Sequence, residues 1–279
     1  MRIGGMAEMH RGTDLGQLFG GLREMGMESC QLVCWEPELL NKAQAELVRR
    51  EAARRGVEIT AFWCGWQGPC VWNFYDGQLT LGLVPEAYRF ARMETLRRGI
   101  GFAAALGVRD VVTHAGFLPE NPYDAAYPAI LVCIKELVRL CKANGQNFLF
   151  ESGQETPVTL KRAIQDVEKE LGPGNIGVNL DPANLILYGK GNPVDALDVF
   201  GEYVRGVHAK DGCYPTDGHS LGEEKPLGQG KVNFPALLAR LKQLGYDGDL
   251  TIEREITGEQ QKKDILAAKK LLEEILESL

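Results

Sequence analysis

Several sequence signals are missing from this chain of 279 residues. No apolar run approaches the roughly 18 residues that a membrane-spanning helix needs, so a membrane protein is not expected. No G-x-G-x-x-G motif follows a strand pattern, and no Walker phosphate-binding loop is present. The usual support for a nucleotide-binding fold is therefore absent.

The seven cysteines lack the pattern of a disulfide framework or a zinc ribbon. Their number is odd and no C-x-x-C pair occurs, which favours free thiols in a reducing compartment. The first five residues lead directly into a strand pattern without the apolar stretch of a secretory signal. These features together predict a cytoplasmic protein.

Positive charge is in deficit. The chain has 31 Lys and Arg against 38 Asp and Glu, a formal net charge of −7. Because binding to a nucleic-acid backbone rests on clustered cations, we expect no nucleic-acid partner. A small anionic substrate needs only a local positive pocket and stays open.

Apolar strand patterns alternate with helical patterns along the whole chain. Such alternation predicts a parallel sheet, and eight repeats favour a single-domain α/β protein, a (β/α)8 TIM barrel over residues 1–279. The expected strands are residues 2–6, 30–35, 57–64, 110–114, 147–151, 176–181, 204–208 and 249–253. The expected helices are residues 14–25, 42–55, 85–106, 125–143, one opened by Thr156-Pro157, 194–203, 234–244 and 260–278.

The last four strands each end in a residue that can bind a metal ion. These residues are Glu151, Asp181, His208 and Glu253. In a parallel barrel all strand ends meet on one face, where the active sites of such barrels lie. Three carboxylates and one imidazole there suit a single divalent ion, with Mn²⁺ preferred and Mg²⁺, Co²⁺ or Zn²⁺ as alternatives. The long segments 65–84 and 211–232 would be loops on the same face.

The C-terminal half resembles the xylose isomerase-like TIM barrels, which include sugar-phosphate isomerases, ketose 3-epimerases and endonuclease IV. The matching segments occur in the family's order, whereas the N-terminal half matches mainly in architecture. They are Phe150-Glu-Ser-Gly-Gln-Glu155, Asn179-Leu-Asp-Pro-Ala-Asn184, Gly206-Val-His-Ala-Lys-Asp211, Pro226-Leu-Gly-Gln-Gly230 and Thr251-Ile-Glu-Arg-Glu255.

The resemblance implies a metal-dependent sugar isomerase or epimerase that acts on a ketose or a ketose phosphate. The metal would polarise the carbonyl, and removal of the α-proton would give an enediolate. The resemblance assigns Glu151 and Glu253 as the acid/base pair as well as metal ligands, with Asp181 and His208 as ligands alone. It also implies a homo-oligomer, because barrels of this group often associate through their loop faces.

Five further residues are candidates for substrate binding. Lys210 follows His208 by two residues, and Glu155 follows the strand end at Glu151, although an ion pair and solvation at a helix start explain them equally well. His114 ends a strand and is either a substrate contact or a structural histidine. Trp35 and Trp66 lie at or beyond strand ends, where they form an aromatic wall for a sugar or pack in the core.

Three other functions stay open at this point. An inosose dehydratase-type lyase would use the same metal site and the same proton removal. An endonuclease IV-like nuclease needs three metals and more than the four histidines present. Asn184 stands where such nucleases place a further histidine, although Asp217 and His219 keep a second metal conceivable. A metal-binding barrel without catalytic activity is the third alternative.

Overall fold

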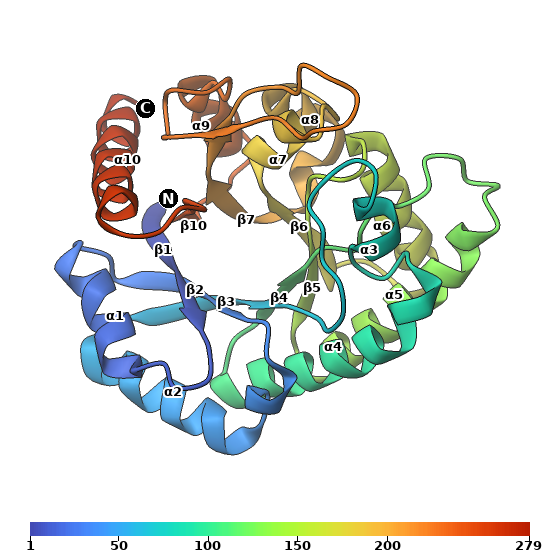
Figure 1. The fold of residues 1–279 in the computed structure, drawn as a ribbon, viewed down its shortest axis with the longest axis horizontal. Helices are drawn as coiled ribbons and strands as arrows, with labels where there is room; N and C mark the ends of the chain where they lie inside the picture. Colours follow the sequence, from blue (N-terminus) through green and yellow to red (C-terminus); the bar gives the residue numbers. More distant parts are fainter.

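The computed structural model describes all residues, 1–279, as one closed parallel barrel. Eight strands follow one another around the barrel in chain order, and β1 closes it by pairing with both β2 and β10. Figure 1 shows these strands at the centre and the longer helices outside them. The strands are β1 (Arg2–Met9), β2 (Ser29–Cys34), β3 (Glu58–Cys64), β4 (Asp110–Thr113), β5 (Asn147–Glu151), β6 (Ile176–Leu180), β7 (Val204–Ala209) and β10 (Asp249–Ile252).

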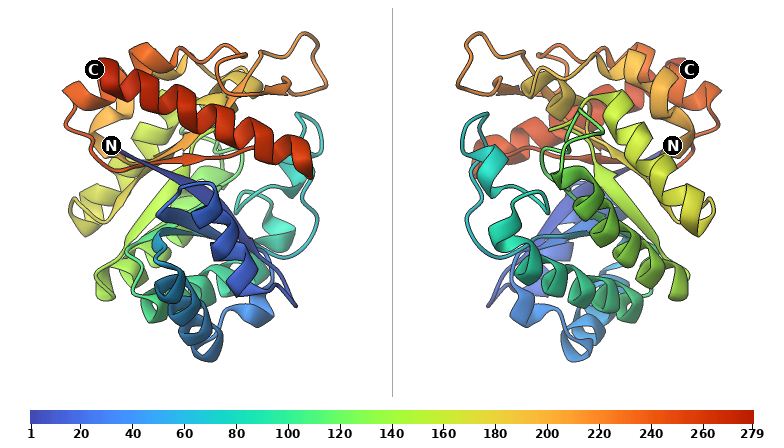
Figure 2. Two further views of the ribbon diagram at one scale, coloured as in Figure 1. Left: turned by 90° about the vertical axis from the view of Figure 1, so that its left-hand side faces the viewer. Right: turned by 90° about the vertical axis from the view of Figure 1, so that its right-hand side faces the viewer.

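A ring of helices covers the outer face of the barrel. None of them combines the length and the apolar character needed to span a lipid bilayer. The long helix α10 lies across the outside, as both views of Figure 2 show. The covering helices are α1 (Leu15–Glu24), α2 (Lys42–Arg55), α4 (Glu86–Leu106), α5 (Ala126–Ala143), α6 (Pro157–Leu171), α8 (Pro193–Phe200), α9 (Phe234–Gln243) and α10 (Glu259–Ser278).

Short polar residues start several of these helices, and glycines end several of them. The side chains of Asp14 and Asn41 accept hydrogen bonds from backbone N–H groups in the first turns of α1 and α2. Gly56 and Gly107 follow α2 and α4 with φ of 68° and 81°, a left-handed conformation that favours glycine. The start of α2 and the ends of α2 and α4 therefore follow from local sequence.

The interior of the barrel has an apolar part and a polar part. Val33, Ala61, Trp63, Val112 and Leu149 form one buried cluster there. The main core, with 57 buried residues, lies between the strands and the helices. At the amino ends of the strands a polar cavity of about 310 Å³ reaches inward to Gln31 and Asn179. The polar part of the interior thus runs beneath the strand ends where the candidate ligands lie.

All the predicted strands and helices are present, although some of their ends are shifted. The structure also contains short elements that were not predicted. The first strand continues to Met9 instead of ending at Met6, and the predicted helix 194–203 divides into α8 and the 3-10 helix η2 (Gly201–Tyr203). Four short elements and a second 3-10 helix were not predicted, because segments this short carry no readable periodicity. They are η1 (Pro37–Leu39), α3 (Gly77–Thr80), α7 (Pro182–Leu187), β8 (Asp211–Gly212) and β9 (Glu224–Lys225).

Two long loops rise over the carboxyl ends of the strands. One connects β3 to α4 and contains α3, and the other connects β8 to β9. Tyr75 of the first stacks on His219 of the second, with ring centroids 5.2 Å apart. The two loops approach each other at one end of the molecule (Figure 2). The buried guanidinium of Arg92 holds the first loop through backbone carbonyls of Gln67, Pro69 and Gly82.

Asp211 holds the segment that follows the second loop. Its Oδ1 atom accepts hydrogen bonds from the backbone N–H groups of Gly212 and Val232, and Oδ2 accepts from Gly228 and Gly230. The approach at Gly230 requires glycine, because a Cβ atom there would lie 2.1 Å from Asp211 Oδ1. The family-like segments 206–211 and 226–230, which end at Asp211 and Gly230, are therefore held together as one structural unit.

Replacing Asp211 with Asn should destabilise the fold by about 2–4 kcal/mol, because an NH₂ group would face N–H donors in a buried site. Urea denaturation measures this change. Asp217→Asn is the matched control, since Asp217 accepts two N–H groups in an exposed turn. The control should change stability by less than about 1 kcal/mol. Equal effects of the two substitutions would contradict the role given to Asp211.

Candidate metal centre

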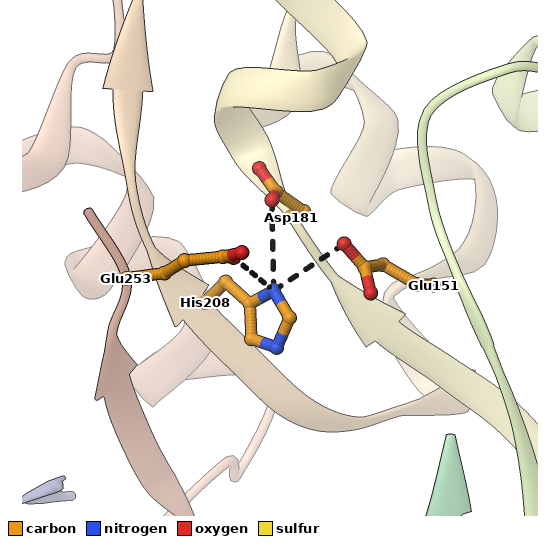
Figure 3. A group of neighbouring side chains, drawn as sticks. All are labelled: Glu151, Asp181, His208 and Glu253. Carbon is orange, nitrogen blue, oxygen red and sulfur yellow. Dashed lines mark ion pairs between the residues drawn. The ribbon is translucent and has the colours of Figure 1, made fainter. Parts of the chain in front are cut away.

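The four residues predicted as ligands converge at the carboxyl ends of β5, β6, β7 and β10. One ligand atom from each lies within 4.8 Å of the corresponding atoms of the other three. Ions such as Mg²⁺, Zn²⁺ and Ca²⁺ bind such atoms at about 2.0–2.6 Å, so one ion can span this spacing. Figure 3 shows Glu151 and Glu253 on opposite sides of the His208 ring and Asp181 between them.

His208 turns its Nδ1 atom toward the three carboxylates. Its Nε2 atom lies 2.8 Å from the carbonyl oxygen of the Gln31 side chain, which only accepts, so Nε2 carries the hydrogen. The Gln31 amide nitrogen in turn donates to Asn179 Oδ1 at 3.3 Å, which fixes the orientation of Gln31. The Nδ1 atom of His208 is then free for a metal ion, as in metal sites where a neighbour fixes the tautomer.

Asp181 serves two purposes with its two oxygens. It follows β6 as the N-cap of α7, and Oδ1 accepts a hydrogen bond from the backbone N–H of Asn184 at 2.8 Å. Oδ2 has no hydrogen-bond partner and lies 3.5 Å from His208 Nδ1. The backbone of Asp181 is held by Ser152, whose hydroxyl both accepts from its N–H and donates to its carbonyl.

Glu151 is held more tightly than Glu253. Its Oε2 atom accepts from the Trp63 indole, and Oε1 accepts from the Asn184 amide at 3.0 Å. Burial raises the pKa of Glu151, but His114 and His208 outweigh this and hold it well below its usual value. Glu253 is partly exposed, and its Oε2 atom has no hydrogen-bond partner, although it lies 2.9 Å from His208 Nδ1.

The centre as a whole attracts positive charge. Three unpartnered buried atoms face one another, namely Asp181 Oδ2, Glu253 Oε2 and His208 Nδ1. Burial lowers the pKa of His208, but Glu151 and Glu253 raise it well above its ordinary value. Three carboxylate oxygens and one imidazole nitrogen are a fitting donor set for a divalent cation. These four residues therefore form a candidate divalent metal site.

Lys210 is buried among the carboxylates of the centre. Its Nζ atom lies 2.7 Å from Glu255 and 3.6 Å from both Asp181 and Glu253. Burial lowers the pKa of Lys210, but these carboxylates, with Glu253 the strongest, hold it well above its usual value. Of the two interpretations left open by the sequence, the ion pair is present, and it places a charged ammonium group next to the metal site.

His114 and the four tryptophans form one wall beside the centre. The His114 Nδ1 atom donates to the backbone carbonyl of Glu151, and Nε2 lies 3.3 Å from the Glu151 carboxylate. Trp63 and Trp72 contact the His114 ring at centroid distances of 5.8 and 5.3 Å. Trp35 and Trp66 pack behind them, with Trp66 only 3% exposed. Trp72 is the most exposed of the four.

Glu155 is buried at the start of α6, and its Oε1 atom has no hydrogen-bond partner. The interpretation that Glu155 is a solvated residue at a helix start is therefore wrong. The remaining histidines lie elsewhere: His219 is exposed and stacks on Tyr75, and His10 is exposed beyond β1. Asp217 and His219 are not among the residues grouped as potential metal ligands.

The residues that orient the ligands were not predicted from the sequence. Gln31, Asn179 and Asn184 are buried side chains that contact His208, Gln31 and Glu151 respectively. The sequence signal that could have identified them is a polar residue inside an apolar strand pattern, as for Gln31 in β2 and Asn179 in β6. A buried polar side chain needs a partner, so such residues mark a polar interior.

Replacing Gln31 with Leu should weaken Mn²⁺ binding by about 10–100-fold, because His208 loses the acceptor that fixes its tautomer. Isothermal titration calorimetry on metal-free protein measures the Kd. Gln17→Leu on the exposed side of α1 is the control and should leave the Kd unchanged. A wild-type Kd for Gln31→Leu would show that Gln31 is not a positioning residue.

Glu155 should make stability depend on pH. Burial raises its pKa from 4.5 to about 7, despite the opposing charge of His114. The folded state therefore favours the protonated form, and the resulting stability is complete below pH 4.5 and lost as the pH rises to about 7. Between pH 5 and 8, wild type should lose about 2–3 kcal/mol more than Glu155→Gln in urea denaturation. Parallel losses in the two proteins would contradict this prediction.

Comparison with known proteins shows the family and the fold of this chain. The family model for xylose isomerase-like TIM barrels matches residues 19–275. A xylose isomerase domain protein from Planctomyces limnophilus has a TM-score of 0.91 at 32% identity, over 98% of this chain and 96% of that one. A D-tagatose 3-epimerase-like protein has a TM-score of 0.72 at 23% identity, over 99% of this chain and 97% of that one.

A curated relative is an uncharacterised protein of Methanocaldococcus jannaschii, 27% identical over 205 residues. The match covers 69% of this chain and 64% of that protein, less than two-thirds of its length. The match to the family model, over residues 19–275, extends through most of the barrel and includes the segments that carry all four candidate ligands. The chain belongs to the xylose isomerase-like TIM barrel family.

Proposed function

We propose that this protein is a divalent-metal-dependent sugar isomerase or epimerase that acts on a ketose. The observation that carries the proposal is the pair of carboxylates, Glu151 and Glu253, on opposite sides of the His208 nitrogen (Figure 3). Two such groups can remove a proton from one face of a substrate carbon and return it to the other face. The D-tagatose 3-epimerase-like structural neighbour supports the same chemistry.

Glu151, Asp181, His208 and Glu253 would hold the ion, with Mn²⁺ as the preferred metal. A divalent ion bound there would act as a Lewis acid toward the carbonyl and the neighbouring hydroxyl of the substrate and make the α-proton acidic. Oxygen-rich donor sets with a single imidazole favour Mn²⁺ or Mg²⁺ over softer ions.

The two glutamates differ in what holds them, and this suggests a division of work. Both oxygens of Glu151 are hydrogen-bonded, which keeps its carboxylate in one position and in the charged form. Glu253 has a free Oε2 atom and is partly exposed toward the mouth of the barrel. Glu253 is therefore the freer base, and Glu151 would exchange the proton on the opposite face, in an order set by the configuration of the substrate.

Lys210 and the aromatic wall would position the sugar. The Lys210 ammonium group lies 3.6 Å from both Asp181 and Glu253, where it can donate to a substrate oxygen next to the reacting carbon. His114 lies against Trp63 and Trp72, and an aromatic wall packs well against the C–H face of a sugar. Trp35 and Trp66 would support this wall from behind.

Replacing Glu253 with Gln should lower the rate of α-proton exchange by about 10²–10⁴-fold, because the amide cannot accept the proton. The assay incubates metal-loaded protein with a panel of ketoses in D₂O and follows deuterium incorporation next to the carbonyl by NMR. Glu151→Gln should have a similar effect. Glu277→Gln, on the exposed end of α10, is the control and should exchange at the wild-type rate.

Metal content must be measured for each variant, so that loss of the ion is separated from loss of proton transfer. Wild-type exchange in either site variant would remove that glutamate from the acid/base pair. Release of water from the substrate instead of epimerisation would identify a dehydratase on the same site. Full metal loading without exchange on any ketose or inosose would favour a barrel without catalytic activity.

A further inference from the structure

Lys210 places a charged ammonium group next to the candidate ligand oxygens. Its side chain is 2% exposed, and its Nζ atom lies 3.6 Å from Asp181 Oδ2 and 3.6 Å from Glu253 Oε1. The same Asp181 oxygen lies 3.5 Å from His208 Nδ1 and has no hydrogen-bond partner. An ion bound by this oxygen would therefore have the ammonium group as its neighbour, in a site shielded from bulk water.

Glu255 holds the Lys210 ammonium group without belonging to the ligand set. Its Oε1 atom accepts a hydrogen bond from Nζ at 2.7 Å, the shortest of the three carboxylate contacts that Lys210 makes. The amide oxygen of Asn184 lies farther from Nζ, at 3.5 Å. The Glu255 side chain is 57% exposed, so this ion pair runs from the buried centre to the surface.

A network of ion pairs fixes the backbone of Glu255. Its N–H group donates to the two oxygens of Glu224 at 3.0 and 3.2 Å. Glu224 pairs with Arg254 at 2.8 Å, and Arg254 pairs with Asp264 of α10 at 2.8 Å. Glu255 is therefore held in place although its carboxylate reaches solvent, and it can orient the Lys210 side chain.

The charges of the buried centre balance when Lys210 is counted with a divalent ion. The carboxylates of Glu151, Asp181 and Glu253 carry three negative charges. The imidazole of His208 binds metal ions in its neutral form. A divalent ion leaves one negative charge, which the Lys210 ammonium group neutralises. The ammonium group also repels any cation that the same oxygens bind, and this repulsion grows with the charge of the cation.

We propose that Lys210 is a built-in counter-charge that limits the affinity of the centre for metal ions, and that Glu255 is the positioning residue that sets this limit. Glu255 draws the ammonium group toward itself and so leaves Asp181 and Glu253 available to the ion. The pair matches the centre to divalent ions, because a trivalent ion would leave the buried site with a net positive charge. The inference rests on the candidate metal site, which the proposed function also requires, and not on the reaction.

Lys210→Met removes the charge and keeps most of the side-chain volume. Titration calorimetry on metal-free protein should give a Kd for Mn²⁺ at least tenfold lower than that of the wild type, because the repulsion is lost. The gain should be larger for Tb³⁺, measured by displacement of Mn²⁺, since the repulsion grows with ion charge. Lys225→Met, which breaks the more exposed pair of Lys225 with Glu223, is the matched control and should change neither Kd.

Glu255→Gln tests the positioning role. It should weaken Mn²⁺ binding about tenfold in the wild-type protein and about twofold or less in Lys210→Met. A direct attraction between Glu255 and the ion would act equally in both backgrounds, so the comparison separates the two roles. Glu255→Asp keeps the charge and should restore most of the affinity.

The melting temperature supplies a readout that a purely structural role of Lys210 would not reproduce. Lys210→Met should melt below the wild type in EDTA, because three buried carboxylates lose their cation. Saturating Mn²⁺ should narrow this difference, since the variant binds the ion more tightly. A difference that Mn²⁺ leaves unchanged would contradict the counter-charge.

The binding results can also overturn the proposal. An unchanged or higher Kd for Lys210→Met would remove the counter-charge, and a wild-type Kd for Glu255→Gln would remove the positioning role even if Lys210→Met did not fold. Wild-type protein that binds no Mn²⁺ would contradict the proposed function as well. Tighter binding by Lys210→Met without α-proton exchange on any ketose would support the counter-charge and contradict only the proposed reaction.

Discussion

Three carboxylates around one imidazole nitrogen are the constraint on which this structure depends. Glu151, Asp181 and Glu253 each place an oxygen within 3.5 Å of His208 Nδ1. The carboxylate oxygens themselves lie within 4.8 Å of one another, where like charges repel strongly in a buried site, so the arrangement calls for a cation. Donors to Glu151 favour its charged form, and the acceptor at His208 Nε2 turns the Nδ1 atom toward the three carboxylates.

Much of this arrangement can be predicted from sequence because it follows from topology. Once eight βα units are recognised, closure of the barrel brings the ends of non-adjacent strands such as β5 and β10 to one face. Residues that follow an apolar strand then become neighbours without any knowledge of side-chain contacts. The same reasoning cannot find Gln31 or Asn184, because their roles depend on a partner from another strand or helix turn. Their contacts are 177 and 33 residues distant in sequence.

The loops were harder to predict for a different reason. Their long spans were expected to cover the active face, but α3, α7 and the β8–β9 pair are too short to carry a periodic pattern, and tertiary contacts hold them in place. Asp211 alone gathers four backbone N–H groups, and Arg92 gathers three carbonyls. A charged residue next to a loop is usually interpreted as solvent-exposed, although the charges of Asp211 in β8 and Arg92 in α4 organise neighbouring backbone that has no regular hydrogen-bonded structure.

Asp181 connects the metal centre to helix α7. One of its oxygens caps α7, and the other faces His208. The same short helix carries Asn184, which holds Glu151, and ends at Tyr188, which faces the loop of Gln154. A cation that fixes the Asp181 carboxylate therefore also fixes the start of the helix that presents Tyr188. The metal site and the orientation of Glu151 therefore depend on one short helix of six residues.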